Sequence, residues 1–247
     1  MPAVTIRRAL AAVLSLSLLA GTAVAPVAAI AQDAEPMLIA PPSLDLALPT
    51  LASASLAPAA EPAFAPAKIR LPACEYRDEL TRYRKVKPWK KTLLDTNLKV
   101  KRLYKPWDLV SVSRADIAGS GKVRRIMIKD LKALAAAARK AGKPLAVRSA
   151  YRSYDYQKGL FDSYVRSYGL DQARKFSARP GHSEHQLGTT LDFSVGPGVP
   201  LTTKFGDSPS GKWLARNVCK FGFVMSYPKC NKYGSCYGYE PWHWRYF

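Results

Sequence analysis

The sequence of 247 residues has few acidic residues, few cysteines and very few histidines. It holds 18 Asp and Glu against 38 Lys and Arg, which gives a formal charge of +20 at pH 7. This balance excludes an acidic disordered chain and indicates an anionic partner. The four cysteines are too few for a miniprotein built on disulfides. No repeat with a period of about 20–50 residues is visible, which disfavours a solenoid or a propeller.

The first 31 residues have the pattern of an export signal. Arg7 and Arg8 precede an uncharged apolar run over 9–20, and the Ala-Ile-Ala of 29–31 offers a cleavage site before Gln32. Because no charge occurs between residues 9 and 32, an uncleaved membrane anchor is the alternative. In either case we expect the rest of the chain to be exported, with membrane contact only through the uncleaved anchor.

The segment 32–68 differs in composition from the rest of the chain. It is rich in Ala, Pro, Leu and Ser and has no basic residue before Lys68. Repeated proline opposes helix and sheet, so we expect a disordered, semi-extended tether. The remaining residues, 69–247, have the length of one ordinary domain and hold nearly all of the basic residues.

The domain alternates between helical and strand patterns after a loop-rich lead-in. Apolar spacing and glycine stops predict helices, and short β-favouring runs predict strands. The mixed order, with hairpin-like connections late in the chain, favours an α+β fold with a small antiparallel sheet flanked by helices. The expected helices cover 128–141, 154–168 and 210–221, with Ser210 as the cap of the last, and the expected strands cover 145–149, 190–195, 223–227 and 242–247.

The exported context favours disulfide bonds between the cysteines. Four cysteines allow three pairings, and the sequence alone does not choose among them. We expect Cys219 to pair with Cys230 and Cys74 with Cys236, with the local pair Cys230–Cys236 as the alternative. A structural zinc site is disfavoured, because the four residues show no Cys-x-x-Cys spacing.

The three histidines occur in two short motifs near the C-terminal end. His182 and His185 lie in PGHSEHQLGTTLDF, and His243 lies in EPWHWRYF. A hydrolytic zinc site needs three protein ligands and one open position, and His185, Asp192 and His243 can supply the three ligands. Gly188 lets the chain turn between the first two of them.

A general base must also lie beside such a site. Glu240 is three residues before His243, and Pro241 with the β-favouring run that follows places Glu240 in a turn before a strand. Each residue alone is a weak signal, since a single loop histidine is usually a surface or hydrogen-bonding residue. Their combination carries the argument.

Taken together, the two motifs resemble the VanY-type zinc D,D-carboxypeptidases, which are LAS-type peptidoglycan metallopeptidases. The family pattern is SxHxxGxxxD followed by ExWH, and the resemblance covers roughly 93–247, including the segment 149–154. Thr190 departs from the pattern, because the family commonly has alanine there. The matching residues here are Ser183, His185, Gly188, Asp192, Glu240, Trp242 and His243.

The resemblance implies an LAS/hedgehog-like zinc peptidase fold and a role for each matching residue. Zn²⁺ would be held by His185, Asp192 and His243, with Glu240 as the general base. Arg152 would stabilise the oxyanion, since a fixed guanidinium offers two donors to developing negative charge. The substrate-binding positions would be Gln157, Ser183 and Tyr227. His182 matches no ligand position, and Trp242 and Trp244 are expected to pack.

The implied activity is removal of the terminal D-alanine from peptidoglycan stem peptides, by D,D- or L,D-cleavage. A peptidoglycan endopeptidase and a non-catalytic cell-wall-binding module on the same fold are the alternatives. The basic domain also suits anionic cell-wall polymers. A nucleic-acid partner is disfavoured, because the chain is exported and shows no nucleic-acid-binding module. We expect a monomer.

Overall fold

The computed structural model describes residues 73–229 and 236–247, so the expected export signal and the whole of the expected tether lie outside the described part. Cys230 also lies outside it. Among the described residues, no helix is both long and apolar enough to span a membrane.

A five-stranded sheet forms the centre of this α+β domain. It is mixed rather than antiparallel, because the edge strand β4 runs parallel to β6 while the other neighbours are antiparallel. The order across the sheet is β4 (Ala118–Gly119), β6 (Ala146–Ser149), β7 (Thr190–Ser194), β9 (His243–Tyr246) and β8 (Phe223–Met225). The two-stranded sheets pair β1 (Glu79–Leu80) with β2 (Leu98–Lys99), and β3 (Leu109–Ser111) with β5 (Lys122–Arg124).

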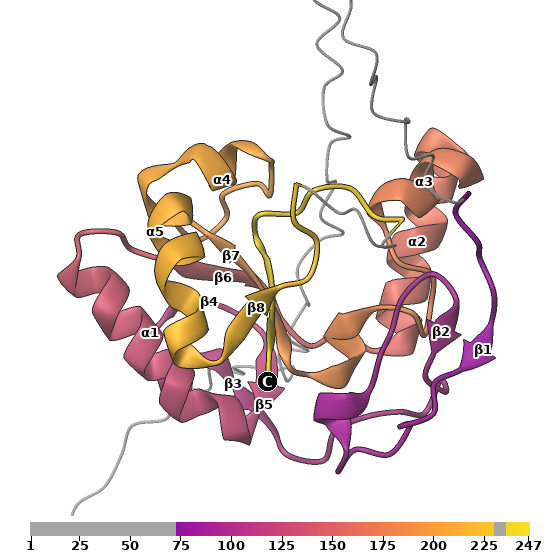
Figure 1. Cartoon of the computed structure of the whole chain (residues 1–247), viewed down its shortest axis with the longest axis horizontal. Coiled ribbons are helices and arrows are strands. Elements are labelled where there is room, and N and C mark those ends of the chain that lie inside the picture. The colour runs from indigo at the N-terminus through magenta and orange to yellow at the C-terminus, as the bar shows by residue number, and fades with distance from the viewer. Residues whose placement is uncertain (1–72, 230–235) are drawn as a thin grey trace, which may run out of the picture. The chain divides into compact units, whose positions relative to one another are not determined.

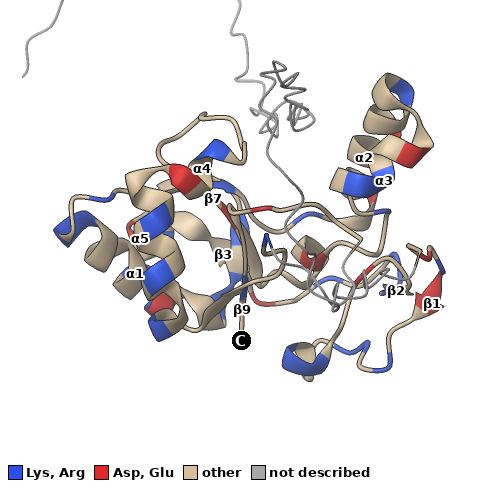
Figure 2. Cartoon of the chain, turned by 45° about the horizontal axis from the view of Figure 1, so that its top comes forward, with Lys and Arg blue, Asp and Glu red and all other residues tan. Residues whose placement is uncertain are grey.

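The α-helices are divided between the two sides of the five-stranded sheet. Figure 1 shows α1, α4 and α5 on one side and α2 and α3 on the other. Figure 2 shows basic residues on several of these helices, including α1 and α5. The bounds are α1 (Ile128–Lys140), α2 (Tyr154–Tyr168), α3 (Leu170–Phe176), α4 (Lys204–Asp207) and α5 (Pro209–Asn217), with short 3₁₀ helices η1 (Trp89–Lys91), η2 (Val112–Ala115), η3 (Arg125–Met127), η4 (Glu184–Leu187) and η5 (Val218–Phe221).

The helices expected over 128–141 and 154–168 are confirmed. α1 buries Leu131, Leu134, Ala135 and Ala138, which recur at helical spacing on one face. Ser153 is the N-cap of α2, and its side chain accepts a hydrogen bond from the backbone nitrogen of Tyr156, while Gly169 caps the other end.

The cap expected for the helix over 210–221 is wrong. Ser208 is the N-cap of α5, and its Oγ accepts a hydrogen bond from the backbone nitrogen of Gly211. Ser210 lies inside the first turn, and its hydroxyl donates to the carbonyl oxygen of Pro144. Proline is favourable at the first helical position, so Pro209 starts the helix one residue after Ser208. The α-helix ends at Asn217, and η5 continues to Phe221.

Alternation along the two central strands separates the core from a polar face. Leu191 and Phe193 of β7 belong to the main hydrophobic core. So do Trp244 and Tyr246 of β9, which confirms Trp244 as a packing residue. Because successive side chains of a strand point to opposite faces, Thr190, Asp192, His243 and Arg245 lie on the other face, toward α2.

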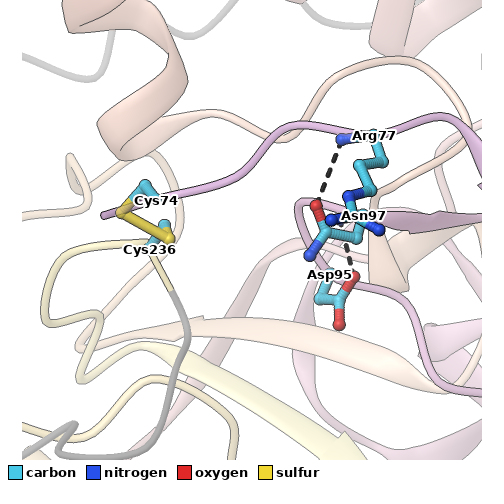
Figure 3. Close-up of a disulfide and its surroundings, with 5 residues drawn as sticks. All are labelled: Cys74, Arg77, Asp95, Asn97 and Cys236. Atoms are coloured by element: carbon cyan, nitrogen blue, oxygen red, sulfur yellow. Dashed lines mark hydrogen bonds between the residues drawn. A yellow bond between two sulfur atoms is a disulfide. The ribbon is translucent and has the colours of Figure 1, made fainter. Parts of the chain in front are cut away.

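Cys74 and Cys236 form a disulfide bond, with their Cα atoms 5.6 Å apart (Figure 3). The bond ties the start of the described lead-in to the segment just before β9. Beside it, the backbone nitrogen of Arg77 donates to Asn97 Oδ1 at 3.1 Å. Cys219, on the short helix η5, is exposed and has no disulfide partner among the described residues. Its expected partner, Cys230, lies outside the described part of the chain, so the Cys219–Cys230 bond stays a prediction.

Candidate metal and catalytic site

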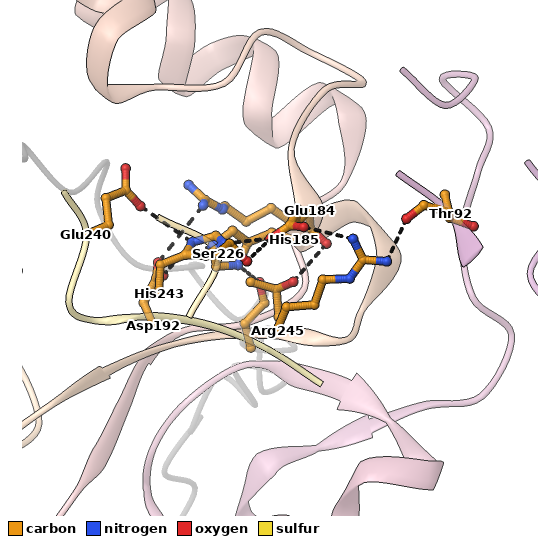
Figure 4. Close-up of polar contacts among 11 residues, drawn as sticks. Thr92, Glu184, His185, Asp192, Ser226, Glu240, His243 and Arg245 are labelled. Carbon is orange, nitrogen blue, oxygen red and sulfur yellow. Dashed lines mark hydrogen bonds and ion pairs between the residues drawn. The ribbon is translucent and has the colours of Figure 1, made fainter. Parts of the chain in front are cut away.

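The cross-strand register places two of the expected metal ligands side by side. Asp192 of β7 is directly opposite His243 of β9 in the antiparallel ladder. Side chains of directly opposed residues on one face lie close together. His185 comes from η4, just before β7. One ligand atom from each of the three buried residues lies within 4.8 Å of the other two (Figure 4).

A left-handed turn brings His185 to this face. Gly188 follows η4 with a φ of +70°, a conformation that glycine adopts without steric cost. A Cβ atom at this position would also approach Leu109 Cδ2 to 2.9 Å. The expectation that Gly188 turns the chain between His185 and Asp192 is therefore confirmed.

The ring of His185 is fixed with one nitrogen toward Asp192. Its Nδ1 lies 2.7 Å from the carbonyl oxygen of Ala150, and because a carbonyl only accepts, Nδ1 carries the hydrogen. Nε2 is then the lone-pair nitrogen, 3.2 Å from Asp192 Oδ2. Burial, with the positive charge of Arg152, lowers the pKa of His185 to about 4, so the ring is neutral at pH 7.

The donor set fits a zinc ion. His185 Nε2 and Asp192 Oδ1 are buried and have no aligned hydrogen-bond partner among the described residues. Asp192 lies 3.2 Å from each histidine. Zinc ligands bound at about 2.0–2.2 Å in a tetrahedron lie about 3.3–3.6 Å apart. Two imidazoles and one carboxylate at this spacing suit zinc, and buried polar atoms rarely lack a partner without reason.

His243 is held between two carboxylates. Its Nδ1 lies 3.2 Å from Asp192 Oδ1, and its Nε2 lies 3.0 Å from Glu184 Oε2. Burial opposes the charged ring, but the carboxylates of Asp192 and Glu184 beside its two nitrogens outweigh that effect and raise the pKa of His243 to about 10. Burial also opposes the ionised form of Asp192, but the two histidines hold its pKa well below the usual range.

Glu240 lies in the turn that precedes β9, as expected. The backbone nitrogen of His243 donates to the Glu240 carbonyl oxygen at 3.1 Å, which closes the turn. Glu240 Oε2 lies 3.5 Å from His243 Nδ1, at the side of the three ligands. Burial raises the pKa of Glu240 to about 7, opposed by His243 and reinforced by Asp192. A carboxyl group with a pKa near neutrality suits a general base.

The ligands open into a pocket between the sheet and α2, with an open space of about 420 Å³ that includes its solvent-exposed part. Arg152 lines it, with Nη2 4.0 Å from Asp192 Oδ2 and with Nε unpaired among the described residues. Gln157 Nε2 donates to the carbonyl oxygen of Ala178 at 2.7 Å, which leaves Oε1 without a described partner. Ser183 and Tyr227 also line the pocket.

The pocket has an apolar and aromatic part that the sequence analysis did not identify. Tyr237 follows the disulfide and packs its ring 5.2 Å from that of Tyr227, which in turn lies 4.6 Å from His243. Trp242, expected to pack, belongs to the core and also lines the pocket. The remaining lining residues that were missed are Leu160, Tyr164, Phe176, Ser177 and Ala178.

His182 lies away from the three ligands and links the site loop to the lead-in. It is fully buried, with Nδ1 2.8 Å from the carbonyl oxygen of Asp95 and Nε2 2.8 Å from Asp78 Oδ1. Thr190, the departure from the family pattern, donates its hydroxyl to the carbonyl oxygen of Glu184 at 3.2 Å. The threonine therefore stabilises the loop that carries His185.

Comparison with known protein families agrees with this geometry. The family described as "VanY: D-alanyl-D-alanine carboxypeptidase" matches residues 120–247, just over half of the chain. The chain belongs to this family. Its VanY-family part contains the whole set of His185, Asp192, Glu240 and His243, together with Arg152.

Curated relatives are similar over part of their length. YodJ of Bacillus subtilis (strain 168) is 40% identical over 149 residues, which cover 58% of this chain and 54% of YodJ. A D-alanyl-D-alanine carboxypeptidase of Enterococcus faecium is 36% identical over 100 residues, 40% of this chain and 29% of that relative. The chain thus spans about half, or less, of the length of these two relatives.

Solved structures of VanY-family enzymes share the fold. The LdcB LD-carboxypeptidase, whose structure concerns peptidoglycan recognition, is 34% identical with a TM-score of 0.58, covering 70% of this chain and 88% of that chain. VanY from a VanB-type resistance cassette, in complex with Zn(II), is 28% identical with a TM-score of 0.53, covering 64% and 88%. VanYB in complex with D-Ala-D-Ala is 28% identical with a TM-score of 0.52, and the match covers 62% of this chain and 84% of that chain.

Two buried charged residues beside the ligands were also missed. Glu184 precedes His185, and Arg245 follows His243 by two residues. Arg245 could have been found from the sequence, because residues two apart on a strand share a face and Arg245 lies two residues after the expected ligand His243. Glu184 had no such signal in the sequence, since its contacts with β9 are tertiary.

Metal binding to this VanY-family site is expected to release a proton. At pH 7 the pKa of His185 near 4 leaves that ring neutral, whereas the pKa of His243 near 10 leaves it protonated in the metal-free protein. A ligating nitrogen must lose its proton, so zinc should displace the proton of His243 at pH 7 together with part of a proton from Glu240, whose pKa near 7 a bound cation lowers, and zinc affinity should fall as the pH is lowered. Calorimetric titration in buffers of different ionisation enthalpy measures the number of protons released. A titration showing no release at pH 7 would contradict the assigned ligand.

Proposed function

We propose that the chain is a zinc-dependent carboxypeptidase that removes the terminal D-alanine from peptidoglycan stem peptides, by D,D- or L,D-cleavage. The observation that carries the proposal is the buried group of His185, Asp192 and His243 at the foot of a pocket, with Glu240 beside it. The relatives LdcB and VanYB, whose structures concern peptidoglycan and D-Ala-D-Ala, support this substrate class.

The residues of the chain divide the chemistry among them. Zn²⁺, when bound by His185, Asp192 and His243, would supply Lewis acidity and lower the pKa of a water molecule. Glu240 takes a proton from the attacking water and delivers it to the leaving amine. A protonated Glu240 cannot accept, so the reaction requires its ionised form.

Arg152 and the pocket residues act on the substrate. The guanidinium of Arg152 offers donors to the negative charge that develops on the scissile carbonyl oxygen. Gln157, Ser183 and Tyr227 hold the end of the peptide. The hydroxyls of Ser183 and Tyr227 can donate to a free C-terminal carboxylate, whereas the unpaired Oε1 of Gln157 can accept from an N–H of the peptide.

Mass spectrometry of defined muropeptides, incubated with the zinc-loaded protein, tests the proposal. Loss of one D-alanine from a pentapeptide stem indicates D,D-cleavage, and loss of one from a tetrapeptide indicates L,D-cleavage. Cuts inside the stem would instead indicate an endopeptidase. Intact substrates with zinc-loaded, folded protein would exclude the activity.

We also propose that the protein acts outside the cytoplasm as a monomer. The pattern of residues 1–31 supports export, and the segment 32–68 has the length to act as a tether. The excess of Lys and Arg favours contact with anionic wall polymers. N-terminal sequencing of the exported protein should give a chain beginning at Gln32, whereas a chain beginning at Met1 would indicate the anchor.

A further inference from the structure

Glu184 is a buried carboxylate that the proposed reaction does not use. It is 5% exposed, and both of its oxygens are occupied by donors (Figure 4). Oε2 accepts from His243 Nε2 at 3.0 Å and from the Ser226 hydroxyl at 2.6 Å. Oε1 accepts from Arg245 Nη1 at 2.8 Å. A buried carboxylate destabilises the fold unless hydrogen-bond donors surround it. Glu184 has such donors on both oxygens, and this arrangement requires an explanation.

The bond to Glu184 decides which nitrogen of His243 faces the other ligands. A carboxylate is an acceptor, so the Nε2 that points to Glu184 must carry a hydrogen. Nδ1 is then the nitrogen left to bind a metal, and it is the one that lies 3.2 Å from Asp192 Oδ1. The hydrogen bond made by one ring nitrogen generally determines which nitrogen is the ligand.

Arg245 prevents Glu184 from leaving this position. Its Nη1 binds Glu184, while its Nη2 donates to the backbone carbonyl oxygens of Trp89 at 3.2 Å and Thr92 at 2.6 Å. These carbonyls belong to the lead-in, upstream of the residues 120–247 that match the family. Arg245 is 3% exposed and shares the strand face of His243. The guanidinium thus connects the lead-in backbone to the partner of a metal ligand.

We propose that Glu184 is a positioning residue for the ligand His243, and that Arg245, anchored on the carbonyls of Trp89 and Thr92, holds Glu184 in place. The inference rests on the proposed zinc site. It gives the lead-in segment around η1, whose Trp89 and Thr92 are buried, a part in the site although this segment supplies no ligand. A purely structural ion pair is the competing role, and the chain contains a matched example.

Arg124 and Asp108 form that matched pair. Arg124 Nε lies 2.9 Å from Asp108 Oδ1, and the two side chains are as buried as Glu184 and Arg245. Arg124 also donates to a lead-in carbonyl, that of Val86. Neither side chain touches one of the three ligands, so Asp108→Asn is a control for the loss of a buried ion pair alone.

The test compares the zinc dissociation constants of Glu184→Gln, Asp108→Asn and the unchanged full chain, by competition with a chelator at a temperature where all are folded. Glu184→Gln should bind zinc about 10–100-fold more weakly, the usual effect of losing a partner of a ligating histidine. Asp108→Asn should lower the melting temperature of the metal-free protein and leave zinc affinity within about twofold, since it touches no ligand. Equal zinc affinity in all three, or equal weakening in both variants, would overturn the inference.

Two further measurements keep the test decisive if the single variant does not fold. Glu184→Leu/Arg245→Met removes both charges together, which avoids an unpaired buried charge, and it should show the same loss of zinc affinity. Nitrogen NMR of histidine in the unchanged zinc-loaded protein should show Nε2 of His243 protonated, and the reverse tautomer would refute the role of Glu184. Failure of the unchanged chain to bind zinc would refute the proposed function instead.

Discussion

His185→Ala and His243→Ala are expected to lose zinc and, with it, the release of D-alanine. Each change removes one of three ligands from a site that already has an open position, and zinc held by two side chains exchanges readily. The loss of affinity should exceed the roughly 100-fold that follows from removing a partner of a ligand. Metal analysis after dialysis, combined with chelator competition, measures it.

His182→Gln is the matched control for the two ligand variants. His182 lies three residues before His185 and is equally buried, but its ring binds Asp78 and the carbonyl oxygen of Asp95. We expect this variant to keep its zinc. If the folded His182→Gln protein lost zinc as His185→Ala does, the assignment of ligands would have to be revised.

Glu240→Gln is expected to keep zinc and to lose turnover. Glutamine preserves the size of the side chain but does not accept a proton, and loss of a general base typically costs about 10²–10⁴-fold in rate. Zinc content and D-alanine release, measured on the same preparation, separate the two effects. Glu79→Gln removes the same charge from the exposed strand β1 and serves as the control.

Glu240 should also determine how kcat/KM falls on the acid side of the pH profile. Burial raises the pKa of Glu240 to about 7 in the metal-free protein, and a bound cation favours the ionised form and lowers that value. Because only the ionised carboxylate accepts a proton, kcat/KM should fall as the pH drops through a pKa at or below 7. Near-normal turnover of zinc-loaded Glu240→Gln would refute the mechanism, and loss of zinc in that variant would make Glu240 a ligand.

Several elements of the fold could be predicted because their signals are local. The apolar spacing of α1 and the glycines that follow α1 and α2 act within a few residues. The short strands of the lead-in and α3 were missed, since segments of two to seven residues carry little periodic signal. The parallel pairing of β4 with β6 was also missed, because strand direction is decided by distant parts of the chain.

The sequence by itself determined the chemical identity of the candidate site. His185, the Asp192 that follows it at fixed spacing, and the Glu240 that precedes His243 form a pattern rare enough to indicate zinc hydrolysis.

Only the tertiary structure decided how those residues are held. The register that sets Asp192 opposite His243, the ring orientation imposed by Glu184, and the anchoring of Arg245 on the lead-in all join segments far apart in the chain. Both strands could be predicted from the sequence but their pairing could not, because register depends on which faces pack together. A buried charge such as Glu184 is stable only where its donors converge, and that convergence is a property of the folded chain alone.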